Sequence, residues 1–153
     1  MTEPLPAFSS LAIGEGRFDY GDVILASLPP TASRDPREWA ETMFAINGVP
    51  APVRALFVLR AALAPLLALR PAPSGVFEVR EVVGDEALLS FDDDHLEFRL
   101  AVGVDDAAAI VRVTTIVRLH NWRGRLYYAV VSLLHPIVVH AMLRRARRTL
   151  TRR

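Results

Sequence analysis

Three groups of polar residues in this 153-residue chain could support chemistry, and the first is an acidic cluster. Asp92, Asp93 and Asp94 are followed by His95, and carboxylate and imidazole groups are common metal ligands. Neighbouring residues on a strand point to opposite faces, so at most two of the four side chains converge without a bend. The alternative is a polar turn that leads into a strand. We favour the turn, and we predict neither a metal nor a cofactor.

The second group, His120 and Asn121, lies at the end of a predicted strand. A histidine can act as a general base near neutral pH. The alternation of the strand places His120 on its polar face with Arg112 and Arg118, away from the expected core. The alternative is a structural pair, in which Asn121 caps the following helix and Gly124 allows a tight turn.

The third group lies on an apolar helix near the end of the chain, and its polar members are Tyr127, Tyr128, His135 and His140. We expect these residues to face a sheet, with Tyr127 and His135 on one stripe of the helix. A histidine and a tyrosine hydroxyl there could orient a mostly apolar ligand. Alternatively, they are core residues that bond to each other, to the backbone or to Thr115. The sequence leaves both interpretations open.

Composition narrows the class of protein. Hydrophobic residues make up 52% of the chain, the mean hydropathy is +0.26, and the absence of cysteine excludes disulfides. The first residues, MTEPLPAF, contain an acid and two prolines where a signal peptide has a basic start and an apolar run. We therefore expect a cytoplasmic protein. No phosphate loop, zinc-ligand spacing or nucleophile elbow occurs.

The charge is distributed unevenly. Six of the 18 basic residues lie in 144–153, which leaves 12 basic and 17 acidic residues elsewhere, a net charge of −5. A basic tail on an acidic body suggests contact with phosphates or anionic lipid. Alternatively, these cations stabilise the C-terminus of a helix through its dipole. Nucleic acid is not an expected partner, because no recognised module is present. The arginines available for membrane contact are Arg144, Arg145, Arg147 and Arg148.

The first half of the chain predicts an irregular lead-in, a strand and two helices. Ser33 or Asp35 is expected to cap the first helix, with Pro36 in its first turn. Pro65 should bend or break the second helix near its end. The expected ranges are a lead-in at 1–16, a strand at 17–28, helices at 36–47 and 51–69, and a boundary at 70–75.

The second half predicts strands with period two. In the strands expected at 95–105 and 109–120, apolar and polar residues alternate without error. A four-residue loop at 105–108 would pair Val104 with Ala109 and place His95 opposite Arg118. The expected strands are 76–83, 87–94, 95–105 and 109–120.

The last helix, expected at 124–149, is long and apolar enough to span a membrane. Three features oppose that interpretation. His135 and His140 would lie within lipid, and Pro136 removes a backbone hydrogen bond there. Removing the helix would also leave the apolar face of the sheet uncovered. We therefore predict that this helix covers the sheet.

Four sequence blocks carry a resemblance to a known family: FDYGDVI, DDDHLEFRL, VTTIVRLHNWRGRLYY and LLHPIVVHAMLRRA. With the order of elements, they resemble the helix-grip fold of the START-like and polyketide-cyclase proteins. Within that superfamily the chain resembles a bacterial family without an assigned activity, the domain-of-unknown-function family 2867. The resemblance implies one α+β domain over 1–153, in which a curved antiparallel sheet wraps the C-terminal helix. It also implies a small-molecule cavity, but no reaction.

These observations predict a non-catalytic protein that binds a small, largely apolar molecule between sheet and helix, with Trp39 near the mouth. One alternative is an enzyme of the cyclase or hydrolase kind that uses His135 or His120. Another is a membrane-surface protein that uses the arginine tail. The expected binding residues are Trp39, Phe98, Leu100, Thr115, Val117, Tyr127 and His135.

Overall fold

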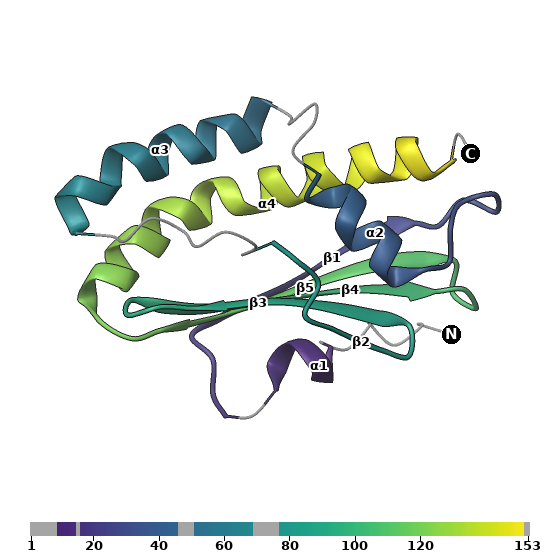
Figure 1. The fold of residues 1–153 in the computed structure, drawn as a ribbon, viewed down its shortest axis with the longest axis horizontal. Helices are drawn as coiled ribbons and strands as arrows, with labels where there is room; N and C mark the ends of the chain where they lie inside the picture. The colour runs from purple at the N-terminus through teal and green to yellow at the C-terminus, as the bar shows by residue number, and fades with distance from the viewer. Residues whose placement is uncertain (1–8, 15, 46–50, 69–76, 152–153) are drawn as a thin grey trace, which may run out of the picture.

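A five-stranded antiparallel sheet with helices on both faces forms the fold (Figure 1). The computed structural model describes residues 9–14, 16–45, 51–68 and 77–151. The strand order is β1-β5-β4-β3-β2, so the first strand lies at one edge and the two longest strands lie inside. The strands are β1 (Tyr20–Ser27), β2 (Glu81–Val83), β3 (Glu86–Asp92), β4 (Leu96–Asp105) and β5 (Ile110–Leu119).

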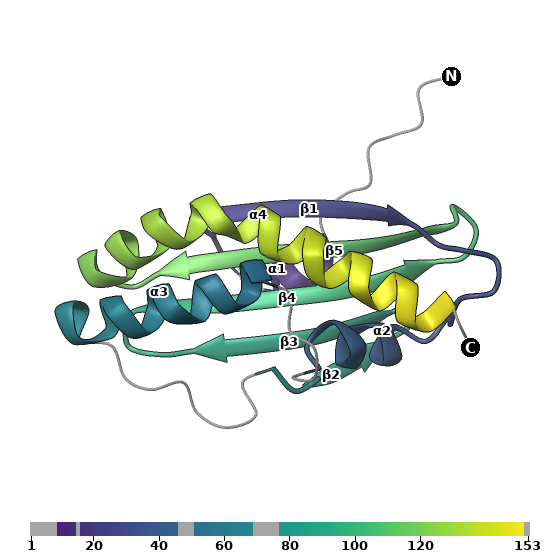
Figure 2. The same ribbon diagram turned by 90° about the horizontal axis from the view of Figure 1, so that it is seen from above.

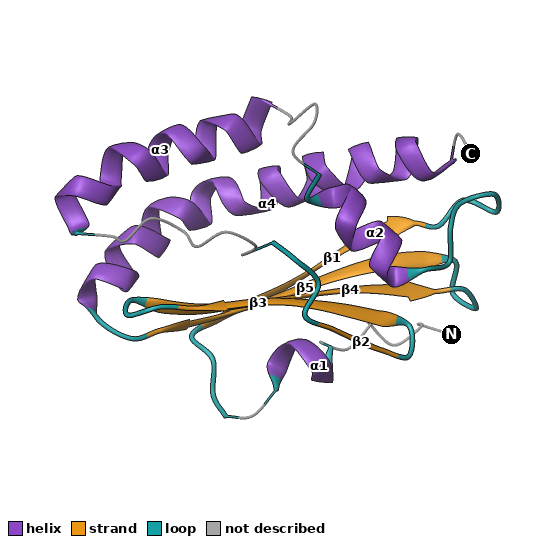
Figure 3. Ribbon diagram, in the orientation of Figure 1, coloured by secondary structure: helices purple, strands orange, loops and turns teal. Residues whose placement is uncertain are grey.

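Helices cover one face of this sheet, and a short helix lies on the other, as Figures 1 and 3 show. The expected α+β architecture is therefore confirmed, including the two helices after the first strand and the long helix at the end. The helices are α1 (Ser10–Ile13), α2 (Pro36–Met43), α3 (Ala51–Leu67) and α4 (Trp122–Thr151).

Helix α2 begins as its sequence predicts. Asp35 is the N-cap and its carboxylate accepts a hydrogen bond from the Arg37 N–H at 2.9 Å, with Pro36 in the first turn. Helix α3 continues through Pro65 and ends two residues later. The predicted boundary at 70–75 lies outside the described residues.

The lead-in is not wholly irregular, because α1 packs on the far face of the sheet. Ala12 is fully buried there against Ala101 and Ile116. Arg99 donates hydrogen bonds to the carbonyls of Leu11 and Ala12, and Arg118 donates one to Ile13. Guanidinium groups of the sheet thus satisfy carbonyls that a one-turn helix leaves unpaired.

The turn between β4 and β5 corrects the predicted register. Val104 pairs with Val111, not with Ala109. The loop keeps its predicted four residues but begins one residue later, because the Asp105 carboxylate accepts a hydrogen bond from the Ala108 N–H at 2.9 Å. The register moves by two residues, so the same side chains stay on the buried face.

The shifted register also changes the residue that lies opposite Arg118. Arg118 lies directly opposite Glu97, and their side chains are 3.1 Å apart. His95, which was predicted to lie opposite Arg118 with Glu97 in diagonal reach, instead precedes β4 in the turn that leads to it. Charged groups thus pair across the strands on the face that also carries α1.

Helix α4 covers the sheet, as predicted. Its C-terminal half buries Val138, Met142 and Leu143 against the sheet, together with Trp39 and Met43 of α2. Length and composition alone would allow α4 to cross a membrane, yet 44% of its most apolar window is buried inside the protein. One side of the helix is therefore packed in the core. The helix continues through Pro136.

Candidate functional site

A cluster of polar side chains lies where the edge strand β1 meets α4. The Tyr20 hydroxyl donates a hydrogen bond to Asp22 Oδ2 at 2.9 Å, and His135 Nε2 lies 3.3 Å from the same oxygen. The rings of Tyr20 and Tyr128 are 5.1 Å apart, and the rings of Tyr20 and His135 are 6.3 Å apart in an edge arrangement. We call Tyr20, Asp22, Thr115, Tyr128 and His135 the polar cluster.

The local sequence explains why these side chains converge. Tyr20 and Asp22 are two residues apart on one strand, so they share a face, and Asp22 lies directly opposite Thr115 of β5. Tyr128 and His135 are seven residues apart on α4, which places them on the same side of the helix two turns apart. The alternation of β1, its pairing with β5 and the helical period of α4 therefore direct these five side chains toward the space between sheet and helix.

His135 Nε2 lies at ion-pair distance from Asp22 Oδ2, and Tyr128 interacts with the Tyr20 hydroxyl. Even so, four polar atoms of the cluster are buried without a well-formed hydrogen bond: Asp22 Oδ1, Thr115 Oγ1, Tyr128 OH and His135 Nε2. They are four of the six such side-chain atoms in the described residues. Thr115 is fully buried and His135 is 9% exposed. A buried polar group without a partner costs about 1–3 kcal/mol, so this concentration calls for an explanation.

Burial also changes the acidity of the two tyrosines. Burial, followed by the neighbouring Tyr20 and Asp22, raises the pKa of Tyr128. Burial, followed by the Asp22 carboxylate, raises the pKa of Tyr20. Both hydroxyls therefore stay protonated at neutral pH and remain hydrogen-bond donors.

We expect stability to fall in alkali because of Tyr128. Above its ordinary pKa of 10.0 the unfolded chain releases this proton while the folded chain keeps it, so the unfolded state is favoured. The contribution is constant below about pH 10, and above it the free energy of unfolding should fall by about 1.4 kcal/mol per pH unit. Denaturant unfolding from about pH 8 to about pH 12 measures this slope.

The variant Tyr128→Phe should have a shallower alkaline slope than the unaltered chain. The titration is readable because all 18 basic residues are arginines and cysteine is absent. Arginine keeps its proton throughout this range, so tyrosines are the side chains that titrate in it. Equal slopes for the two proteins would contradict the raised pKa of Tyr128.

Apolar residues surround the polar cluster. Val117 of β5 and Val131 of α4 pack with Tyr128, and the partly buried Leu56 of α3 joins them. Tyr127, one residue along the helix, faces α3 instead: its hydroxyl accepts a hydrogen bond from Arg60 at 3.1 Å, and the Arg60 guanidinium lies 5.5 Å from the ring centre. The cluster thus lies between sheet, α4 and α3.

The four predicted binding residues of the sheet lie in two cross-strand rows that include members of the polar cluster. One row across the strands contains Tyr20, Val117 and Phe98. The next contains Asp22, Thr115 and Leu100. Leu100 and the half-buried Phe98 also pack in the main core.

Trp39, predicted near the mouth of a cavity, is fully buried in the main core. Its Nε1–H donates to the Ser33 carbonyl at 2.8 Å. A contact between Trp39 and a ligand stays a prediction. His140 is exposed and does not face the sheet, because it lies on the side of α4 opposite His135.

Sequence reasoning missed Tyr20 and Asp22 as site residues. The signal was an acid on the side of the predicted strand that also carries Phe18, Tyr20 and Ile24. A carboxylate on a face that is otherwise apolar or aromatic needs a partner when it is buried. The pairing with Thr115 and the approach of His135 depend on contacts between distant parts of the chain.

The other two predicted groups have structural partners. Asp93 Oδ1 accepts hydrogen bonds from the N–H groups of His95 and Leu96, at 2.7 and 2.9 Å, which makes a turn into β4. His120 Nε2 lies 2.7 Å from Asp92 Oδ1 at the surface. No group of three or more potential metal ligands occurs within the described residues.

Asn121 caps α4, as predicted, because its side-chain oxygen accepts a hydrogen bond from the Gly124 N–H at 3.0 Å. Gly124 has a role that differs from the predicted tight turn. It lies within the first turn of α4 and is buried against the His95 carbonyl.

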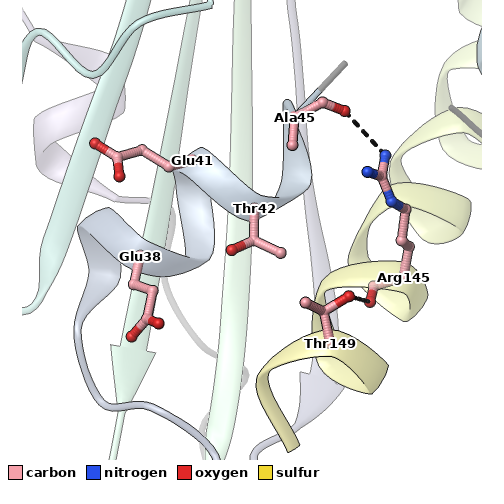
Figure 4. A pocket seen from close by; sticks show the side chains of 6 residues that line it. All are labelled: Glu38, Glu41, Thr42, Ala45, Arg145 and Thr149. Carbon is pink, nitrogen blue, oxygen red and sulfur yellow. Dashed lines mark hydrogen bonds between the residues drawn. The ribbon is translucent and has the colours of Figure 1, made fainter. Parts of the chain in front are cut away.

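A pocket of about 450 Å³ lies between α2 and the end of α4, away from the polar cluster (Figure 4). Its walls carry two carboxylates, two threonine hydroxyls and Arg145, whose guanidinium donates to the Ala45 carbonyl at 3.0 Å. The pocket therefore differs, in its polar lining and its position, from the apolar cavity that the sequence predicted between sheet and helix. The residues that line it are Glu38, Glu41, Thr42, Ala45, Arg145 and Thr149.

Comparison with known proteins places the chain in a family. No curated protein and no solved structure matches it. A family model described as protein of unknown function (DUF2867) matches residues 15–142. This match covers most of the chain, including β1, the whole sheet and most of α4. The chain therefore belongs to the DUF2867 family.

Proposed function

We propose that the protein binds a small, largely apolar molecule at the polar cluster, without catalysing a reaction on it. The observation that carries the proposal is the convergence of four buried polar atoms without well-formed hydrogen bonds. Apolar walls around a few convergent polar groups are the usual composition of a small-molecule site. The proposed relation to the helix-grip superfamily agrees with this position, because those proteins bind ligands between sheet and C-terminal helix.

The polar atoms indicate what the ligand carries. Asp22 Oδ1 can only accept a hydrogen bond, while the protonated Tyr128 hydroxyl can donate one. A ligand hydroxyl would satisfy both atoms, since it donates and accepts. Binding energy would come mainly from burying the apolar remainder of the molecule, at about 25 cal/mol per Å².

Two adjacent threonines of β5 provide a matched test. Thr114 and Thr115 are both fully buried with unpartnered hydroxyls, but they lie on opposite faces of the sheet. The molecule that co-purifies with the protein would first be identified by native mass spectrometry. We expect Thr115→Val to reduce retention of that molecule about tenfold, and Thr114→Val to leave retention unchanged.

Stability measurements on the same variants separate binding from folding. Valine has the shape of threonine without its hydroxyl, so each variant removes one unsatisfied buried group. Without ligand, both should unfold at the same denaturant concentration as the unaltered chain or at a higher one. Equal retention in the two variants, or a protein that carries no small molecule, would refute the proposal.

A second candidate function is proton transfer, which the 3.3 Å approach of His135 to Asp22 favours. His135 would take a proton from a carbon next to a carbonyl, Asp22 would stabilise the resulting imidazolium, and the Tyr128 hydroxyl would donate to the enolate oxygen. Protein in deuterated water would then exchange deuterium into the co-purified molecule. His135→Gln should abolish that exchange. Absence of exchange in the unaltered protein would rule out this candidate.

A further inference from the structure

Helix α3 is apolar on both sides, which is unusual for a helix at a protein surface. Its inner side packs through Val53 and Leu56 against the core. Its outer side is nevertheless also apolar: Val58 is 69% exposed and Leu66 is 79% exposed. Packing against the core therefore does not explain the exposed apolar side chains of this helix.

Helix α4 has the same character in its N-terminal half. Trp122, Leu126, Leu133 and Ile137 are each at least half exposed. Their spacings of four, seven and four residues place them along one side of the helix. At about 100° per residue, that side is opposite to the one through which His135 and its neighbours face the sheet.

The two helices lie side by side on the same face of the sheet, as Figures 1 and 2 show from two directions. Their outward sides therefore form one surface. We call this surface the outer helical face, and its exposed apolar residues are Val58, Leu66, Trp122, Leu126, Leu133 and Ile137. Large apolar patches on a protein surface usually mark an interaction site.

The charge of the two helices restricts the partner. Helices α3 and α4 contain eight arginines and none of the 17 acidic residues of the chain. Arg54, Arg125 and Arg144 are exposed, and the Arg123 guanidinium lies 5.5 Å from the ring centre of Trp122. An apolar surface flanked by arginines, with a tryptophan at one end, complements anionic lipid headgroups above acyl chains.

We propose that the outer helical face binds the surface of an anionic lipid bilayer. The helices lie in the interface and do not cross it, because the other side of α4 is packed in the core. The sequence predicted membrane contact through the arginine tail alone, whereas this proposal assigns the contact mainly to the outer helical face. Part of the tail binds the protein itself, because Arg147 Nε donates to the Ser27 carbonyl at 3.1 Å. Self-association through this face is disfavoured, because two arginine-bearing faces without acids would repel.

The test is sedimentation of the full chain with vesicles. One set contains phosphatidylcholine alone, and the other contains phosphatidylcholine with phosphatidylserine. We expect binding to the phosphatidylserine vesicles at low salt and weaker binding at high salt. The double variant Val58→Ser/Leu133→Ser should reduce this binding about tenfold or more, because both side chains would otherwise be buried in the interface.

The matched control is Val83→Ser. Val83 is 51% exposed on β2, at the opposite edge of the sheet from β1, so its substitution should leave vesicle binding unchanged. All variants should keep the free energy of unfolding within about 0.5 kcal/mol of the unaltered chain, since the altered residues are exposed.

Three outcomes would overturn the proposal. The first is no sedimentation with either set of vesicles. The second is equal binding to both sets at all salt concentrations, which would remove the role of charge. The third is a concentration-dependent dimer, or a complex with another protein, that Val58→Ser/Leu133→Ser disrupts while vesicles do not bind. That result would assign the outer helical face to a protein partner.

Discussion

Replacing Trp39 with alanine should lower the free energy of unfolding by about 3–5 kcal/mol. Trp39 is fully buried between α2, the sheet and α4, and its indole N–H donates to the Ser33 carbonyl. The substitution removes the largest buried side chain of the core and leaves that carbonyl without its partner. Denaturant unfolding followed by circular dichroism measures the change.

The second tryptophan of the chain is the matched control. Trp122 is 63% exposed, so Trp122→Ala should change the free energy of unfolding by about 0.5 kcal/mol or less. If Trp39→Ala kept full stability and lost only its bound small molecule, Trp39 would belong to the mouth of a cavity, where the sequence predicted it. A large loss of stability would assign it to the core.

Replacing Gly124 with alanine should destabilise the protein by about 1–3 kcal/mol or more. A Cβ atom at this position would lie 2.1 Å from the His95 carbonyl oxygen and 2.9 Å from its carbon, both closer than contact allows. The carbonyl cannot move freely, because it accepts a hydrogen bond from the His120 N–H at 2.8 Å. Alanine favours a helix by about 1 kcal/mol relative to glycine, which offsets only part of the clash.

Gly103→Ala is the control for this experiment, since it adds the same methyl group at a strand position with more room. The nearest atom there would be Glu86 Cγ at 3.4 Å, the flexible part of a side chain. Thermal unfolding of both variants should show a clear decrease in Tm for Gly124→Ala and a small change for Gly103→Ala. A Gly124→Ala protein as stable as the unaltered chain would contradict the close packing of α4 against His95.

The polar cluster was predicted in part. Thr115 and His135 followed from local periodicity, because one is on the buried face of an alternating strand and the other on the inner side of an apolar helix. Asp22 and Tyr20 did not follow, since β1 pairs with a strand more than 80 residues later in the chain. Likewise, periodicity placed Tyr127 on the inner stripe with His135, whereas Tyr128 is the buried tyrosine. Adjacent helical residues differ by only about 100°, so the pattern separates them poorly.

The sequence by itself determined the order of elements from β1 to α4, the buried face of the strands, the cap of α4, and α4 as the cover of the sheet. It left Ser33 and Asp35 as alternative caps of α2. These features depend on contacts within a few residues and on the need to bury an apolar face. Only the tertiary structure decided the register of β4 and β5, the place of α1 and the membership of the polar cluster. A shift of two residues keeps every side chain on its face, so the hydrophobic pattern is the same in both registers. In the observed register the Asp105 carboxylate accepts a hydrogen bond from the Ala108 N–H within the loop.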